Sequence, residues 1–89
     1  IKENKIKSLG ITIKDNDQSE GVIVTKVDNQ EIKLSNGDII LEVNREIVES
    51  IKSFSSLVEN YKETGRSSLL LKIKRDEEIS CITIKFVDN

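Results

Sequence analysis

The residues whose types and spacing could form a binding or catalytic site lie near the start of the chain, in residues 7–12, with the sequence KSLGIT. Apolar residues alternate from Leu9 through Ile11 to Ile13, which is the period of a half-buried strand. Gly10 interrupts this pattern, and glycine weakens a strand because it adds backbone entropy and has no side chain to pack. A glycine is tolerated where the chain bends, or where a backbone or ligand must come close. From the residues alone, a bend without a ligand is the favoured interpretation.

Catalytic chemistry finds little support elsewhere in the sequence. The chain has no histidine and one cysteine, Cys81. It therefore lacks the Ser-His-Asp triad, the Cys-His dyad and most zinc sites. Neither a Ser-Lys site nor a carboxylate constellation is visible, and no CxxC motif marks Cys81 as reactive. We therefore expect no catalytic residues, no metal site and no cofactor in this chain.

Composition indicates one small globular domain. The 89 residues are 36% hydrophobic and 34% charged, with a net charge of −2. This length leaves no room for a second core. No basic run alternates with aromatic residues, which argues against a nucleic-acid partner. No apolar run approaches the length of a membrane span, so we expect no membrane insertion by this part of the chain.

The remaining pattern predicts several strands and one long helix. Strands are expected over residues 9–14, 22–27, 39–44, 67–75 and 79–87, the last two forming a hairpin across Asp76 and Glu77. Residues 28–38 form a connection that Ile32 and Leu34 attach to the core. In the last strand the predicted core-facing residues are Ile82, Ile84 and Phe86, while Cys81 lies on the opposite face.

The helix is predicted from a change in hydrophobic period. Ile51, Phe54, Val58 and Tyr61 recur at helical spacing, and the helix is expected to include residues 53–62. Ser50 or Ser53 is a candidate N-cap, and Gly65 follows the expected end. The fold class is therefore α+β: a small, curved, mostly antiparallel β-sheet or partial barrel capped by one main helix. Such an apolar stripe is more often core than groove.

The ordered motifs resemble those of PDZ domains. Residues 8–11, SLGI, resemble the Gly-Leu-Gly-Phe loop, with Ser8 in place of the first glycine and Ile11 in place of the phenylalanine. The later sequence GVIVTKV…GDIILEVNREIV, then the helix, follows in family order over residues 8–87. The connection 28–36 is short and lacks the Ala-Ala-Gly-Leu helix common in the family. On this basis residues 1–7 are expected to be an interdomain tail and residues 8–89 the PDZ-like domain.

The order of the elements narrows the resemblance. The loop motif opens the domain and an extra strand closes it, which is similar to the circularly permuted bacterial type. The chain most resembles the C-terminal PDZ module of an HtrA/DegP-like serine protease, whose parent would be a trypsin-like endopeptidase. The resemblance implies a location in the bacterial periplasm or cell envelope. PDZ modules of C-terminal processing proteases and of site-2-type membrane proteases are further alternatives.

The resemblance also implies a site. The N–H groups of Leu9, Gly10 and Ile11 would hold the terminal carboxylate of a peptide, which would continue as an added strand. The expected groove residues are Thr12, Ile13, Phe54, Leu57 and Val58. Such a pocket favours an apolar C-terminal residue, and Lys5 and Lys7 would add a favourable field.

Two non-catalytic functions follow from this implied site. The first is recognition of peptide or protein C-termini by strand addition. The second is assembly, in which neighbouring domains or subunits of the parent protease fill the groove and free peptides do not bind. A fragment with either function would cleave no peptide bond itself.

Overall fold

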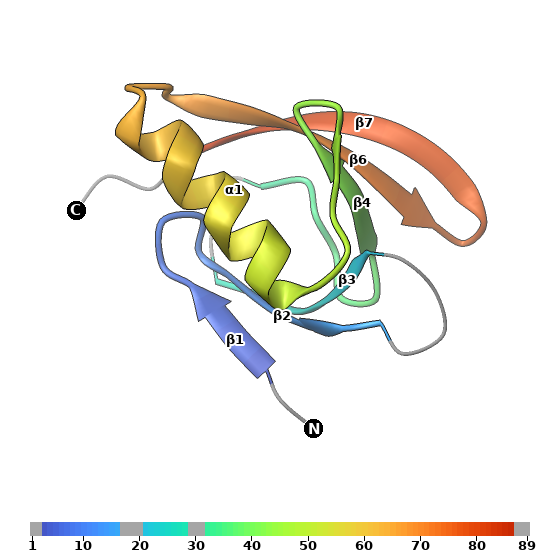
Figure 1. Ribbon diagram of the computed structural model, residues 1–89. Coiled ribbons are helices and arrows are strands. Elements are labelled where there is room, and N and C mark those ends of the chain that lie inside the picture. The colour runs from blue at the N-terminus through green and yellow to red at the C-terminus, as the bar shows by residue number, and fades with distance from the viewer. Residues whose placement is uncertain (1–2, 17–20, 29–31, 87–89) are drawn as a thin grey trace.

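The computed structural model describes residues 3–16, 21–28 and 32–86. The described residues form seven strands and one helix, which lies along one side of the strands in Figure 1. Their bounds are β1 Glu3–Ile6, β2 Ile11–Asp15, β3 Val22–Val27, β4 Ile39–Val43, β5 Glu46–Ile47, α1 Ile51–Glu63, β6 Ser68–Arg75 and β7 Glu78–Lys85.

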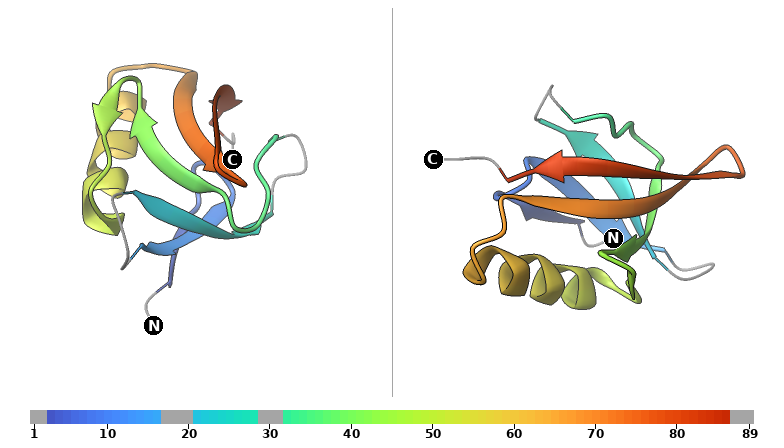
Figure 2. Two further views of the ribbon diagram at one scale, coloured as in Figure 1. Left: turned by 90° about the vertical axis from the view of Figure 1, so that its right-hand side faces the viewer. Right: turned by 90° about the horizontal axis from the view of Figure 1, so that it is seen from above.

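The strands form one open antiparallel sheet. Its order is β1-β2-β3-β4-β6-β7, and the short β5 pairs with β4. The sheet curves, and α1 lies along one side of it (Figure 2). The hydrophobic core lies between the curved sheet and the helix, which contributes Phe54 and Val58. The α+β class predicted from the sequence is confirmed.

Most of the predicted strands are confirmed. The second expected strand, 22–27, coincides with β3, and the expected hairpin is β6–β7 with its turn at Asp76 and Glu77. The predicted faces of the last strand are also observed, because Ile84 is buried and Cys81 is exposed. Ile82 and Phe86 pack only partly against the core, since β7 is an edge strand.

Local hydrogen bonds fix both ends of α1. Ser50 is the N-cap and accepts a hydrogen bond from the Ser53 N–H. At the other end the Gly65 N–H donates to the Lys62 carbonyl and the Arg66 N–H to the Tyr61 carbonyl, which is a Schellman motif. The predicted helix is confirmed, although it begins two residues earlier than 53 and ends one residue later than 62.

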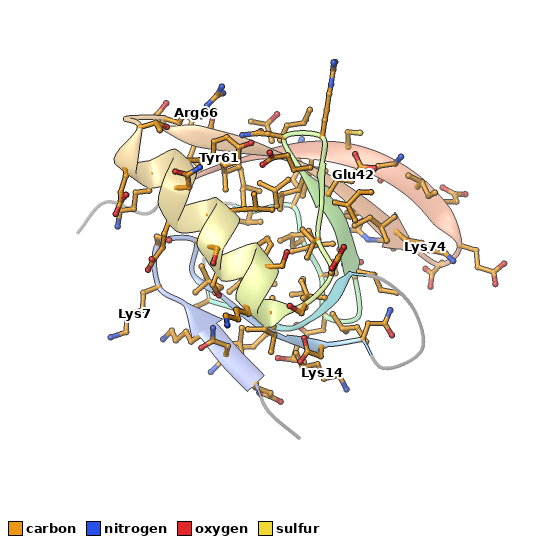
Figure 3. The ribbon with its side chains drawn as sticks, viewed as in Figure 1. Lys7, Lys14, Glu42, Tyr61, Arg66 and Lys74 are labelled. Carbon is orange, nitrogen blue, oxygen red and sulfur yellow. The ribbon has the colours of Figure 1, made fainter. Side chains whose placement is uncertain are left out.

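Side-chain bonds then tie α1 to the sheet. The Ile51 N–H donates to the Asp15 carboxylate at the end of β2, at 2.8 Å. The Tyr61 hydroxyl donates to Glu46 in β5, also at 2.8 Å. These contacts lie near opposite ends of the helix, so they hold one end of α1 to β2 and the other to β5. Figure 3 shows Tyr61 at the C-terminal end of the helix, with Arg66 nearby.

An ion pair between buried Asp38 and exposed Arg75 holds the connection before β4. The Asp38 carboxylate accepts two hydrogen bonds from the Arg75 guanidinium, at 2.9 and 2.7 Å, and one from the Ser35 N–H. Burial raises the pKa of Asp38, but the hydrogen bonds from Arg75 and Ser35 and the charge of Arg75 outweigh it, so the pKa lies below its ordinary value. Ile32 and Leu34 are buried beside this pair, as predicted, while residues 29–31 of the connection lie outside the described part.

The sequence patterns missed β1. Residues 1–7 are predicted to be a tail, yet residues 3–6 form a strand in the same sheet as the rest of the domain. Three of its four residues are exposed and only Ile6 is buried, so no apolar alternation marks the strand. The boundary between tail and domain stays a prediction, but the sheet begins before residue 8.

Candidate functional site

The candidate site is the edge of β2 that lies beside α1. The predicted site residues come together here from the 7–10 turn, β2 and α1. Most of their side chains contribute to the core: Leu9, Ile11, Ile13, Phe54 and Val58 are all buried. Gly10, Thr12 and Leu57 are half-buried. The sequence correctly favours core packing for most of the helical stripe.

Strand β1 occupies the edge of β2 where a peptide strand is predicted to bind. It pairs antiparallel with β2, with Ile6 opposite Ile11, Lys5 opposite Thr12 and Asn4 opposite Ile13. In Figure 1 the two elements β1 and α1 lie side by side. The carboxyl end of β1 therefore lies at the 7–10 turn, in the orientation expected for a peptide with its terminus at that turn.

The N–H groups of the turn converge on one oxygen atom. The Leu9 and Gly10 N–H groups both donate to the Ile6 carbonyl, at 3.1 and 2.8 Å. Gly10 has a φ of +72°, in the left-handed region that favours glycine, and its carbonyl accepts from the Asp28 N–H. The glycine in the sequence is thus explained by a tight hairpin turn, and the turn directs two donors at the end of the strand in the groove.

The two faces of β1 make different contacts. Ile6 is buried, and on the same face the Asn4 amide donates to the Ser55 hydroxyl of α1 at 3.3 Å. On the other face Lys5 forms an ion pair with Asp28 at 3.5 Å. Asp28 also pairs with Lys26 at 3.6 Å. Besides its backbone pairing with β2, β1 is therefore held by one apolar side chain, one exposed hydrogen bond and one exposed ion pair.

Two open cavities flank the contact between β1 and α1. One, of about 380 Å³, is lined by β1, the turn and α1, and its charged residues are Lys5, Lys7, Glu59 and Lys62. The other, of about 580 Å³, lies beside Asp15 and the start of α1. Lys5 is paired with Asp28, so Lys7 and Lys62 against Glu59 leave the first cavity with a small excess of positive charge, which favours an anionic group near the turn. Figure 3 shows Lys7 extending outward from this region.

Other chemistries find no support in the described part of the chain. Within residues 3–16, 21–28 and 32–86, no group of three or more His, Cys, Asp or Glu residues is placed to hold a metal ion. Over the same ranges no helix is long and apolar enough to cross a membrane. The candidate site consists of the backbone donors of the 7–10 turn and the edge of β2 that β1 occupies.

The described residues thus combine an open antiparallel sheet, one helix beside β2 and a glycine turn before β2. The sequence profile of the PDZ domain family matches residues 7–86. The chain therefore belongs to the PDZ domain family, whose members bind proteins or peptides and are not themselves catalytic.

Individual relatives agree with this assignment. The chain is 31% identical over 55 residues to a probable periplasmic serine endoprotease DegP-like of Rickettsia conorii, an alignment that covers 62% of this chain and 11% of that protein. The chain thus spans about a tenth of the length of this relative.

Two solved structures share the fold. The HtrA3 PDZ domain, bound to a phage-derived ligand with the sequence FGRWV, has a TM-score of 0.71 at 23% identity, covering 97% of this chain and 86% of that one. The PDZ domain of EpsC from Vibrio cholerae has a TM-score of 0.68 at 17% identity, covering 92% and 100%.

Proposed function

We propose that this domain binds the C-terminal tails of peptides or proteins by strand addition to β2, between β2 and α1. The observation that carries the proposal is the position of β1: an extended segment lies antiparallel on β2, and its last carbonyl accepts two turn N–H groups. A terminal carboxylate in the same position would accept these hydrogen bonds and add a negative charge. Charge-assisted hydrogen bonds of this kind are stronger than neutral ones.

Two further observations support the proposal. Lys7 and Lys62 of the first cavity favour an anionic terminus. The ligand of the HtrA3 PDZ domain ends in valine, and in this chain an aliphatic residue, Ile6, is buried beside the 7–10 turn. The predicted carboxylate-binding residues remain Leu9, Gly10 and Ile11, with Thr12, Ile13, Phe54, Leu57 and Val58 along the groove.

The parent protein is proposed to be an HtrA/DegP-like serine protease of the bacterial cell envelope, in which this domain regulates or positions substrates. Support comes from the similarity to the DegP-like protein of Rickettsia conorii, which is named as a probable periplasmic protein. A C-terminal processing or site-2-type membrane protease is the alternative parent.

A second function is favoured by the same strand. Because β1 already occupies the edge of β2, the groove can serve assembly, with neighbouring domains or subunits as its partners and no binding of free peptides. The two functions differ in one measurable property, which is the affinity of the domain for a peptide in solution.

The test is a titration of this domain with labelled peptides that end in an aliphatic residue. We expect a dissociation constant on the order of micromolar, corresponding to about −8 kcal/mol. Capping the same peptide with a C-terminal amide removes the charge and should weaken binding by about tenfold or more, since one hydrogen bond to a charged group is worth roughly 1.5–3 kcal/mol. Equal binding of both peptides would exclude the carboxylate site, and absence of binding would favour assembly.

A further inference from the structure

We propose that β1 is a built-in ligand of the groove, and that free partners are C-terminal tails of the same chemistry that bind by displacing it. This inference rests on the proposed function, because it requires that the groove accept tails at all. It adds the chemical class of those tails and a competing segment within the chain.

The direction of β1 is the first argument. A tail that adds antiparallel to β2 with its terminus at the 7–10 turn must run as β1 runs, since Ile6 lies opposite the first residue of β2. The two N–H groups at the turn are already occupied by the Ile6 carbonyl. A tail and β1 therefore require the same strand edge and the same donors, so they cannot both be bound.

The side chains of β1 indicate what the groove accepts. The last position holds an aliphatic residue, because Ile6 is buried at the turn. The preceding position faces a carboxylate, since Lys5 pairs with Asp28. The position before that faces the helix, where Asn4 donates to Ser55. The last three residues of the predicted ligand are therefore, in chain order, a hydrogen-bonding residue, a basic residue and an aliphatic residue. The aliphatic residue carries the free carboxylate.

Few contacts hold β1 on the edge of β2, and this favours its displacement. Residues 3–5 are exposed, the Asn4–Ser55 hydrogen bond is long, and open cavities lie on both sides of it. Exposed ion pairs such as Lys5–Asp28 stabilise little. The family profile also begins at residue 7, so β1 lies outside the part that it matches. The β1 segment is held mainly by its ladder to β2 and by Ile6.

The test compares binding of one probe by variants of the full 89-residue chain. The probe is a labelled peptide that ends in Glu-Asn-Lys-Ile with a free carboxylate. Ile6→Ser removes the buried side chain that retains β1, and it should tighten probe binding by about tenfold or more, because apparent affinity rises with the fraction of open groove. The matched control is Ile79→Ser on β7, where the side chain is 58% exposed, and it should bind as the wild type does.

A second variant leaves the core intact. Lys5→Glu places a carboxylate opposite Asp28 and should tighten binding about twofold to fivefold by repelling β1. Lys74→Glu, an exposed charge reversal on β6, should change nothing. Amide hydrogen exchange gives an independent readout: in Ile6→Ser the Leu9 and Gly10 amides should exchange faster while those of β6 and β7 keep their protection.

The outcomes separate the two proposals. If the wild type binds the probe and Ile6→Ser and Lys5→Glu bind it no better, β1 is not a competitor, and tail recognition survives without it. If no form binds although exchange shows the fold intact, tail recognition fails and the inference fails with it. A dimer that grows with concentration and disappears in Ile6→Ser would place β1 in the groove of a second copy, which would overturn occupation within one chain.

Discussion

The two ends of the sheet carry hairpins of contrasting construction. The β6–β7 hairpin pairs eight residues of each strand across a two-residue turn and buries Leu69, Leu71 and Ile73 in the core. The β1–β2 hairpin pairs four residues across the turn 7–10, and β1 buries only Ile6. The edge strand β7 is thus held by an eight-residue ladder to β6, by buried Ile84 and by half-buried Ile82, whereas the edge strand β1 is held by a four-residue ladder, buried Ile6 and a turn. We therefore expect the β6–β7 hairpin to contribute more to stability, and under our proposal the β1 edge is the one at which ligands exchange.

The largest expected effect comes from truncating a core side chain of the β6–β7 hairpin. Leu71→Ala removes a fully buried side chain from β6 and should lower the free energy of unfolding by about 2–5 kcal/mol. Ile6→Ala in β1 should lower it by less, because the edge of the sheet can close over the missing atoms. Urea denaturation of both variants measures the difference. Equal losses would mean that β1 is as much a part of the core as β6 is.

An intermediate effect is expected at the ion pair beside β6. Asp38→Asn removes the charge that Arg75 and Ser35 bind and should cost about 2 kcal/mol at neutral pH. Because the folded pKa of Asp38 is lowered, its stabilising contribution is fully present above its ordinary pKa of 3.8 and is lost as the pH falls through the lowered folded value.

Urea denaturation of the wild type and Asp38→Asn from pH 7 to pH 2 measures this dependence. The difference in the free energy of unfolding between the two should therefore stay constant down to about pH 5 and shrink below pH 4. A difference that grows on acidification would contradict the lowered pKa. Protection of the β1 amides should not follow this titration, since the pair lies at the β4–β6 side of the sheet.

The same contrast explains what could be predicted from sequence. Strands such as 22–27 and the β6–β7 hairpin bury alternating apolar residues, so their pattern determines both element and face. Strand β1 has the sequence ENKI, which carries one apolar residue and no alternation. Its pairing depends on contacts with β2 and on the turn, and such tertiary effects leave no periodic pattern. Gly10 in the loop motif indicated a turn. That the N–H groups of this turn donate to the Ile6 carbonyl could be seen only in the folded structure.

The smallest of these effects on stability is expected at the turn itself. Gly10 and Gly37 both have positive φ, at 72° and 93°. A valine at either position should be strained by roughly 1–2 kcal/mol, because L-residues disfavour this conformation. Gly37 is the matched control, since a Cβ added there would meet nothing within 4 Å, and it lies in the connection before β4.

Only one of these variants should change binding. Gly10→Val distorts the turn that holds the Leu9 and Gly10 N–H groups, so it should weaken binding of a free-carboxylate peptide well beyond its effect on folding. Gly37→Val should lower stability to a similar extent and leave the affinity unchanged. Peptide titrations with thermal melts as the folding control measure both properties. If the two variants bind alike, the turn does not take part in ligand binding, and Gly10 serves only to close the hairpin.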